Sequence, residues 1–198
     1  MAGGEWTTPK LMVPAYDGRV EPLPMTRRRA FAAHLRKIIA EAFAEPSPRV
    51  RATSSRTVPL AATQAACATC RGQCCSHGGE HAYLDEDTIR RVVRERPGLG
   101  ARGVAALYRA RLGKESFAGS CVFHDAPGCR LPRELRSDLC NEFYCNALKV
   151  FVRDHGAAVP PRLRIVAKSA EGVQRVMVVE VQSQHVATSG QWPRADRA

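Results

Sequence analysis

Eight cysteines are concentrated in the middle of the 198-residue chain, and no cysteine lies outside this region. The first set is Cys67-Ala-Thr-Cys70-Arg-Gly-Gln-Cys74-Cys75, and the second set is Cys121, Cys129, Cys140 and Cys145. Exposed thiols oxidise and cross-link, so this crowding indicates either a disulfide framework or thiolates that bind a soft metal. We expect all eight cysteines to be metal ligands.

Chain length and the amino-terminus favour metal over disulfides. Disulfide scaffolds are mostly short secreted chains that cannot build a core, whereas 198 residues can build one. The start Met1-Ala-Gly-Gly-Glu-Trp6 lacks the basic residues and apolar run of a secretory signal. Nothing in the sequence approaches the run of about 18 apolar residues that a membrane helix needs. We therefore expect a cytoplasmic protein that does not enter a membrane.

The doublet Cys74-Cys75 limits how the thiols are shared. Neighbouring side chains diverge in an extended backbone and lie about 100° apart on a helix. The two sulfurs are therefore not expected to bind one mononuclear ion. Eight cysteines divide into two four-thiolate zinc sites, or into one cluster with several extra thiols, since a 4Fe–4S cluster needs only four ligands.

Other residues near the cysteines widen the choice of ligands. Among the histidines, His124 is the most credible substitute ligand because it stands three residues after Cys121. His77 and His81 flank the first set, and each is expected to be a polar surface residue. On a regular helix Cys140 and Cys145 would be turned about 140° apart, so either the helix starts after Cys140 or the two serve different mononuclear sites.

The residues before the cysteines predict an arm, a helix and a linker. Four prolines in residues 1–25 predict an extended arm. A helix is predicted from Thr26 to about Glu45, and residues 46–59 read as a linker. The apolar stripe of this helix consists of Phe31, Leu35, Ile38, Ile39, Ala42 and Phe43.

Further helices are predicted within and after the cysteine region. The acidic run Asp85-Glu86-Asp87 suits the start of a helix that ends at Pro97-Gly98, and a second short helix is expected from Val104 to Leu112. Cys129, between Gly128 and Pro132, is expected on a loop. A helix from about Ser137 is predicted by Leu139, Phe143, Ala147 and Phe151 at four-residue steps.

The carboxyl-terminal part predicts a β-hairpin. Its strands are Arg162–Lys168 and Val173–Val181, and the second, nearly continuous in apolar residues, is expected to be well buried. Residues 185–198 read as a loose tail. The expected fold is α+β: a small irregular metal-binding domain with several helices and this hairpin. The expected division is 1–59 for the arm, helix and linker, 60–156 for the cysteine domain, and 157–198 for the hairpin and tail.

The net charge of +11 raises the possibility of a nucleic-acid partner. The densest run is Arg27-Arg28-Arg29, followed by Arg36 and Lys37, and a solvated helix face explains it as well as phosphate contacts do. The charge is also spread along the chain. We therefore expect no nucleic-acid binding, and a protein partner docking on the amino-terminal helix is the alternative use of this surface.

The cysteines and their neighbours form a specific pattern over residues 67–146. It reads Cys67-x2-Cys70-x3-Cys74-Cys75, Cys121-x-Phe123, Cys129 and Arg136-x3-Cys140-x2-Phe143-x-Cys145. This pattern resembles that of the YkgJ-type cysteine-cluster proteins, although Ser137 and Asn141 replace the proline and arginine that are usual there. The resemblance implies a zinc- or iron-chelating domain. Relatives include flagellin lysine N-methylases, but this chain lacks a Gly-rich nucleotide loop, so that activity is not expected.

The sequence therefore favours a metal- or iron–sulfur-binding protein, with a slight preference for iron–sulfur over zinc. Two other classes stay open. One is an iron–sulfur oxidoreductase or protein-modifying enzyme, in which a spare thiol such as Cys75 would be the reactive group. The other is a zinc-stabilised module that binds nucleic acid or protein.

Overall fold

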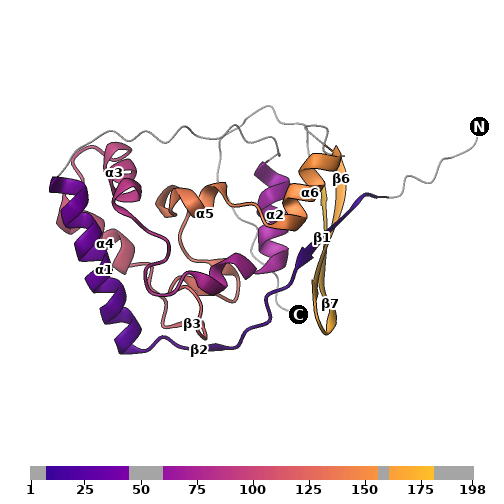
Figure 1. The fold of residues 1–198 in the computed structure, drawn as a ribbon, viewed down its shortest axis with the longest axis horizontal. Helices are drawn as coiled ribbons and strands as arrows, with labels where there is room; N and C mark the ends of the chain where they lie inside the picture. The colour runs from indigo at the N-terminus through magenta and orange to yellow at the C-terminus, as the bar shows by residue number, and fades with distance from the viewer. Residues whose placement is uncertain (1–7, 45–59, 156–160, 181–198) are drawn as a thin grey trace, which may run out of the picture.

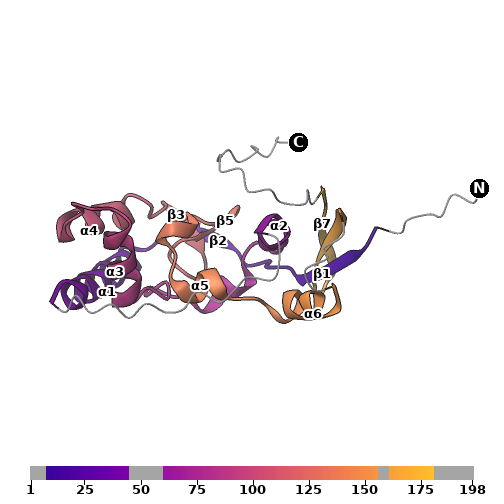
Figure 2. The same ribbon diagram turned by 90° about the horizontal axis from the view of Figure 1, so that it is seen from above.

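The computed structural model describes residues 8–44, 60–155 and 161–180, and these form an elongated molecule whose two ends differ (Figure 1). Three helices occupy one end, and a three-stranded sheet with two helices occupies the other. Short strands and helical turns lie between them, as the view from above in Figure 2 also shows. The α+β class predicted from the sequence is confirmed.

The sheet joins the amino-terminal arm to the predicted hairpin. Strand β1 (Lys10–Pro14) pairs in parallel with β6 (Arg162–Ser169), and β6 pairs antiparallel with β7 (Gly172–Glu180). The order is therefore β1-β6-β7, which confirms the hairpin. The arm supplies an edge strand, the place in a sheet where a proline such as Pro14 is tolerated.

Two helices cover one face of this sheet. Helix α2 (Leu60–Cys70) contacts all three strands, and α6 (Asn146–His155) contacts β1. Alternate residues of β1 and β6 point to this face, because side chains of a strand alternate between the two sides of a sheet. The cluster buried there includes Leu11, Val13, Ala62, Ala66, Leu148, Phe151, Leu163, Ile165 and Ala167.

The prediction that the second hairpin strand is well buried is wrong. Val176 and Val178 of β7 keep 49% and 50% of their surface exposed. Strand β7 lies at the edge of the sheet, and these two residues alternate with Met177, which contacts Thr69 of α2, and Val179, which packs against the apolar cluster. The β-branched residues at these positions therefore favour an extended backbone without being buried.

The helical end is built from α1 (Met25–Ala44), α3 (Glu86–Arg94) and α4 (Ala101–Arg109), with α1 packed against both others. The Asp85 side chain caps α3 by accepting a hydrogen bond from the Thr88 N–H at 2.8 Å, as the acidic run predicts. The predicted stripe of α1 is confirmed at its buried positions, Phe31, Leu35, Ile38, Ile39 and Ala42. Phe43 is the exception, since it is 44% exposed.

The middle of the molecule contains only short elements. Strand β2 pairs antiparallel with β3, and β4 pairs antiparallel with β5. The bounds are β2 (Val20–Pro22), η1 (Gln73–His77), β3 (Glu115–Phe117), β4 (His124–Asp125), β5 (Gly128–Cys129), η2 (Arg133–Leu135) and α5 (Asp138–Glu142).

The single helix predicted from Ser137 onward is wrong, because the chain forms two helices there. Helix α5 ends at Glu142, and Phe143 has the extended backbone angles φ −69° and ψ 123°. Helix α6 then begins at Asn146. Leu139 and Phe143, predicted as core positions of one stripe, are 50% and 45% exposed.

Three predictions fall on residues outside the described ranges. They are the linker 46–59, the tail 185–198, and the domain boundaries near residues 59 and 157. The division into domains therefore stays a prediction. In the described ranges, no helix combines the length and the apolar character needed to cross a membrane.

Candidate metal centre

A left-handed turn places the cysteine doublet. Helix α2 ends at Cys70, and Arg71 and Gly72 follow with φ values of 59° and 80°. Gly72 is required for space as well as for its backbone angle, since a Cβ there would lie 2.8 Å from His124 Nε2 and 3.2 Å from Cys75 Sγ. The chain reverses at this turn and enters η1, where the Cys75 N–H donates to the Gly72 carbonyl at 2.8 Å.

Five thiols line one small cavity between the two ends of the molecule. The cavity measures about 30 Å³, and its walls include Ala82, Leu131 and Arg136. Its thiols come from η1, from the segment before β4, from β5 and from α5. They are Cys74, Cys75, Cys121, Cys129 and Cys140.

Backbone contacts hold Cys121 beside Cys75. The Cys121 N–H donates to the Cys75 carbonyl at 3.0 Å, and the Ser120 hydroxyl oxygen lies 2.8 Å from the same carbonyl. Gly78 leaves room for the side chain of Cys121, because a Cβ at Gly78 would lie 2.7 Å from the Cys121 Cβ. Residues 46 positions apart in the sequence are thus fixed side by side without any regular sheet.

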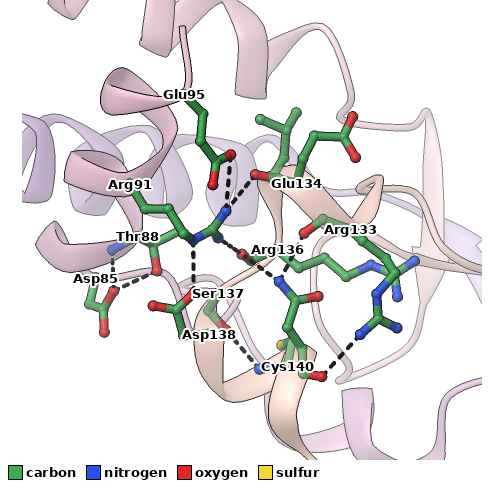
Figure 3. Close-up of polar contacts among 12 residues, drawn as sticks. Asp85, Thr88, Arg91, Glu95, Arg133, Glu134, Arg136, Ser137, Asp138 and Cys140 are labelled. Atoms are coloured by element: carbon green, nitrogen blue, oxygen red, sulfur yellow. Dashed lines mark hydrogen bonds and ion pairs between the residues drawn. The ribbon is translucent and has the colours of Figure 1, made fainter. Parts of the chain in front are cut away.

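The position of Cys140 depends on the polar contacts drawn in Figure 3. The Cys140 N–H donates to the Ser137 hydroxyl at 3.1 Å, which caps α5. Arg91 of α3 donates to Asp138 at 2.8 Å and to the carbonyls of Glu134 and Arg136, at 2.9 and 2.5 Å. One arginine therefore fixes the segment that carries Cys140 against the helical end of the molecule.

The other three cysteines lie toward the sheet. Cys67 and Cys70 lie in the last turn of α2, and Cys145 immediately precedes α6. Cys70 and Cys145 both pack in the apolar cluster beneath the sheet. Spatial grouping therefore differs from order along the chain: Cys75 lies with the second set and Cys145 lies with the first.

Burial and mutual contact perturb the thiols. Burial raises the pKa of Cys121 from 9.0 to about 12, and the thiols of Cys129 and Cys140 add to the rise. A hydrogen bond from the Cys75 thiol lowers the pKa of Cys74 to about 7, and the same bond raises the pKa of Cys75. Because thiolates, not thiols, are the metal ligands, a metal bound here has to displace protons from the buried thiols.

Arg136 supplies a positive charge beside these thiols. It lines the cavity, and its Nε donates to the Leu131 carbonyl at 2.7 Å. Burial raises the pKa of Cys129, and the Arg136 guanidinium is the largest opposing influence. A fixed positive charge beside several thiolates offsets part of their mutual repulsion.

His124, expected as a substitute metal ligand, makes hydrogen bonds within the protein instead. His124 is fully buried, and both of its ring nitrogens face protein partners. With the proton on Nε2, the ring donates to the Arg71 carbonyl at 2.5 Å, and Nδ1 accepts from the Ser120 hydroxyl at 2.6 Å. His124 thus joins the turn after Cys70 to the segment before Cys121. His77 and His81 are exposed, as predicted.

The donor set and the shared cavity fit a soft metal. Thiolates select zinc and iron–sulfur clusters over hard cations such as magnesium or calcium. Within residues 8–44, 60–155 and 161–180, no group of three or more His, Cys, Asp or Glu side chains is placed so that it could hold a metal ion. The fit is therefore one of donor chemistry and common location.

Sequence patterns missed the residues that position the cysteines. The sequence predicts Arg27 on a solvated basic face, but its side chain turns inward and donates to Glu80 at 2.5 Å and to the Ser120 carbonyl. These partners lie 53 and 93 positions away, so no local pattern signals them. The same holds for Arg91, whose partners lie 43 to 47 positions away.

Comparison with known proteins adds no assignment. No family model, no curated protein and no solved structure matches the chain. The resemblance to the YkgJ-type proteins stays a prediction that depends on the cysteine pattern, and function has to be inferred from the site itself.

Proposed function

We propose that the protein binds a metal centre, an iron–sulfur cluster or zinc, through the thiols around the cavity. The observation that carries this proposal is that cysteines from four separate segments line one small cavity. Four of its five thiols would be the ligands: Cys75, Cys121, Cys129 and Cys140. A chain that used these residues only as small apolar side chains would have no need to gather them at one point.

The centre would have a structural effect. The segments around these cysteines form few backbone hydrogen bonds in regular structure, since β4 and β5 are two residues each and η2 is three. A metal bound by four of the thiols would cross-link η1, β5, α5 and the segment before β4. Ligand-binding free energy would thereby become folding free energy of the middle of the molecule.

Between the two kinds of centre, the YkgJ-type resemblance and the doublet favour an iron–sulfur cluster. Such a cluster supplies one-electron redox chemistry, whereas a four-thiolate zinc site is structural and closed. The residues of this chain would hold the centre, limit the access of water with Ala82 and Leu131, and offset its negative charge with Arg136.

Metal analysis of the anaerobically purified protein, with its visible absorption spectrum, tests the proposal. Iron with acid-labile sulfide and a brown colour would identify a cluster, and stoichiometric zinc without colour would identify zinc. Cys129→Ser should lose metal, whereas His77→Ala, which changes an exposed ligand-type residue near the doublet, should retain it. A wild-type protein without stoichiometric iron or zinc would overturn the proposal.

The other two function classes have weaker support. A reactive thiol needs a lowered pKa, and the pKa of Cys75, the thiol named from the sequence, is raised, while that of Cys74 beside it is lowered to about 7. In the densest basic run, Arg27 and Arg28 donate hydrogen bonds within the protein, Arg28 to the Gly113 carbonyl at 2.5 Å. Only part of the run is therefore free to contact phosphates, so metal binding is the function that the site supports best.

A further inference from the structure

An open groove of about 440 Å³ lies between α1 and α4, which pack against each other at the helical end of the molecule (Figure 1). The groove shares no lining residue with the cavity of thiols, so it is a separate feature of the fold. Its floor is apolar and consists mainly of small side chains. The floor residues are Ile39 and Ala40 of α1, and Ala101, Ala105 and Ala106 of α4.

Three exposed arginines surround this floor. Arg36 comes from α1, and Arg102 and Arg109 come from α4. Within the part of the chain that the structure describes, no hydrogen bond or ion pair engages their side chains, and no Asp or Glu lines the groove. Arg27 and Arg91, by contrast, form ion pairs and hydrogen bonds that hold the fold together. The positive charge at the groove is therefore not used inside the described structure.

Helix α4 presents its part of the groove with a regular spacing. Arg102, Ala105, Ala106 and Arg109 stand at i, i+3, i+4 and i+7, which lie on one face of a helix. The two arginines are seven residues apart, so they are separated by two turns, or about 10.5 Å along the axis. An apolar strip with a cation at each end therefore faces the groove.

The stability of α4 does not explain the position of Arg102. The first turn of α4 has no acidic residue, and Gly100 before it supplies no side-chain cap. A positive charge at this end opposes the helix dipole, which favours anions there. A carboxylate bound beside Arg102 would satisfy both the guanidinium and the helix end.

We infer that the groove binds an acidic amphipathic helix of a partner protein. Apolar side chains of that helix would pack on the alanine floor, and carboxylates two turns apart would pair with Arg102 and Arg109. Helices that bind in grooves use anchors at i, i+3, i+4 and i+7, the spacing that α4 presents from its own side. Guanidinium groups suit this role because they bind carboxylates with two parallel hydrogen bonds. The inference goes beyond metal binding and does not depend on it.

The chain itself does not supply such a helix. None of the stretches outside the described ranges contains more than one Asp or Glu. A second copy would bring another net charge of +11, and Asp87 of its acidic run already pairs with Arg90 at 2.6 Å. Nucleic acid fits less well, because phosphates make no use of an apolar floor and no aromatic side chain lines the groove for stacking with bases.

Fluorescence anisotropy with a labelled helical peptide and the full-length protein tests the inference. The peptide carries leucines at i, i+3, i+4 and i+7 and glutamates along both borders of that face, and a second peptide has glutamines in place of the glutamates. Wild type should bind the first peptide about tenfold more tightly than the second. Arg102→Glu with Arg109→Glu should remove this preference, whereas Arg29→Glu with Arg94→Glu, the same charge change at exposed positions outside the groove, should keep it. Ala106→Gln, which adds bulk without charge, should also weaken binding.

Equal losses in the two double variants, or wild type that does not bind the acidic peptide, would overturn the inference. Duplex DNA is measured in parallel: binding that depends on Arg102 and Arg109 and ignores Ala106→Gln, with no peptide binding, would assign the groove to nucleic acid instead. A wild-type dimer in light scattering that dissociates in the groove variant would assign it to a second copy. The comparison of the two peptides needs only the wild type, so it does not depend on how the variants fold. The metal content of the groove variants should equal that of the wild type.

Discussion

Gly78 leaves space for Cys121, and filling this space tests how the cavity is built. Gly78 has φ −75° and ψ −18°, a conformation that alanine adopts without strain. An added Cβ would nevertheless lie 2.7 Å from Cys121 Cβ and 3.2 Å from Cys121 Sγ. Carbon atoms prefer separations of about 3.5–4.0 Å, so Cys121 or the backbone beneath it would have to move by about 1 Å.

The cost of Gly78→Ala follows from two opposing effects. Overpacking costs about 1–3 kcal/mol, and the reduced freedom of the unfolded chain returns about 0.4–1 kcal/mol. We expect the free energy of unfolding to fall by about 1–2 kcal/mol, which lowers the Tm by about 3–6 °C in a protein of this size. If the overpacking costs about 1.4 kcal/mol more in the metal-bound state than in the metal-free state, metal affinity falls about tenfold.

Urea unfolding of the reduced, metal-free protein measures the first effect, and competition with a chelator measures the second. Gly100→Ala is the matched control, because Gly100 has φ −81° and no atom lies within 4 Å of an added Cβ. The control should stay within about 0.5 kcal/mol of the wild type. If Gly78→Ala matches Gly100→Ala in both measurements, the close packing of Gly78 against Cys121 is refuted.

Three further predictions concern side chains around the centre. Burial lowers the pKa of His124 below 6.5, so its stabilising effect is present above that pH and is lost as the pH falls. The free energy of unfolding should therefore drop between pH 7 and pH 5 more steeply in the wild type than in His124→Gln, and equal slopes would contradict this. Arg91→Met should lower the free energy of unfolding by about 2–4 kcal/mol, because the hydrogen bonds of Arg91 are lost. Arg94→Met, an exposed change on the same helix, should stay within about 0.5 kcal/mol of the wild type. Similar losses for the two variants in urea unfolding would exclude the anchoring role of Arg91. Arg136→Met should raise the pKa of Cys129, so chelator competition should show a larger loss of metal affinity at pH 7 than at pH 9, and a loss independent of pH would argue against an electrostatic effect.

Elements governed by local rules could be predicted from the sequence. The stripe of α1 follows helical periodicity, and the cap at Asp85 follows from an acidic residue before an apolar helix. The hairpin follows from two β-branched runs around Gly172. These features depend on residues within about ten positions of each other, which is the range where patterns carry information.

Features set by packing between distant segments could not be predicted. Helix α2 has small buried residues such as Ala62 and Ala66, which produce no clear apolar period. The break at Phe143 depends on how α6 docks beneath the sheet, since the apolar spacing alone continues across it.

The doublet Cys74-Cys75 shows the limit of reasoning from spacing alone. Divergence of neighbouring side chains predicts that the two sulfurs serve different sites, whereas in the structure Cys74 and Cys75 line the same cavity and share a hydrogen bond. Which cysteines accompany them could not be predicted from spacing, because these cysteines come from the segment before β4, from β5 and from α5.

Parallel pairing of β1 with β6 has a consequence for biosynthesis. Leu11 and Val13 pair with Ile165 and Ala167, so β1 has no partner strand until about 150 further residues have been translated. Pairings this distant in sequence form slowly. During that interval the thiols of α2 lack the sheet that will cover their helix and are open to premature cross-linking.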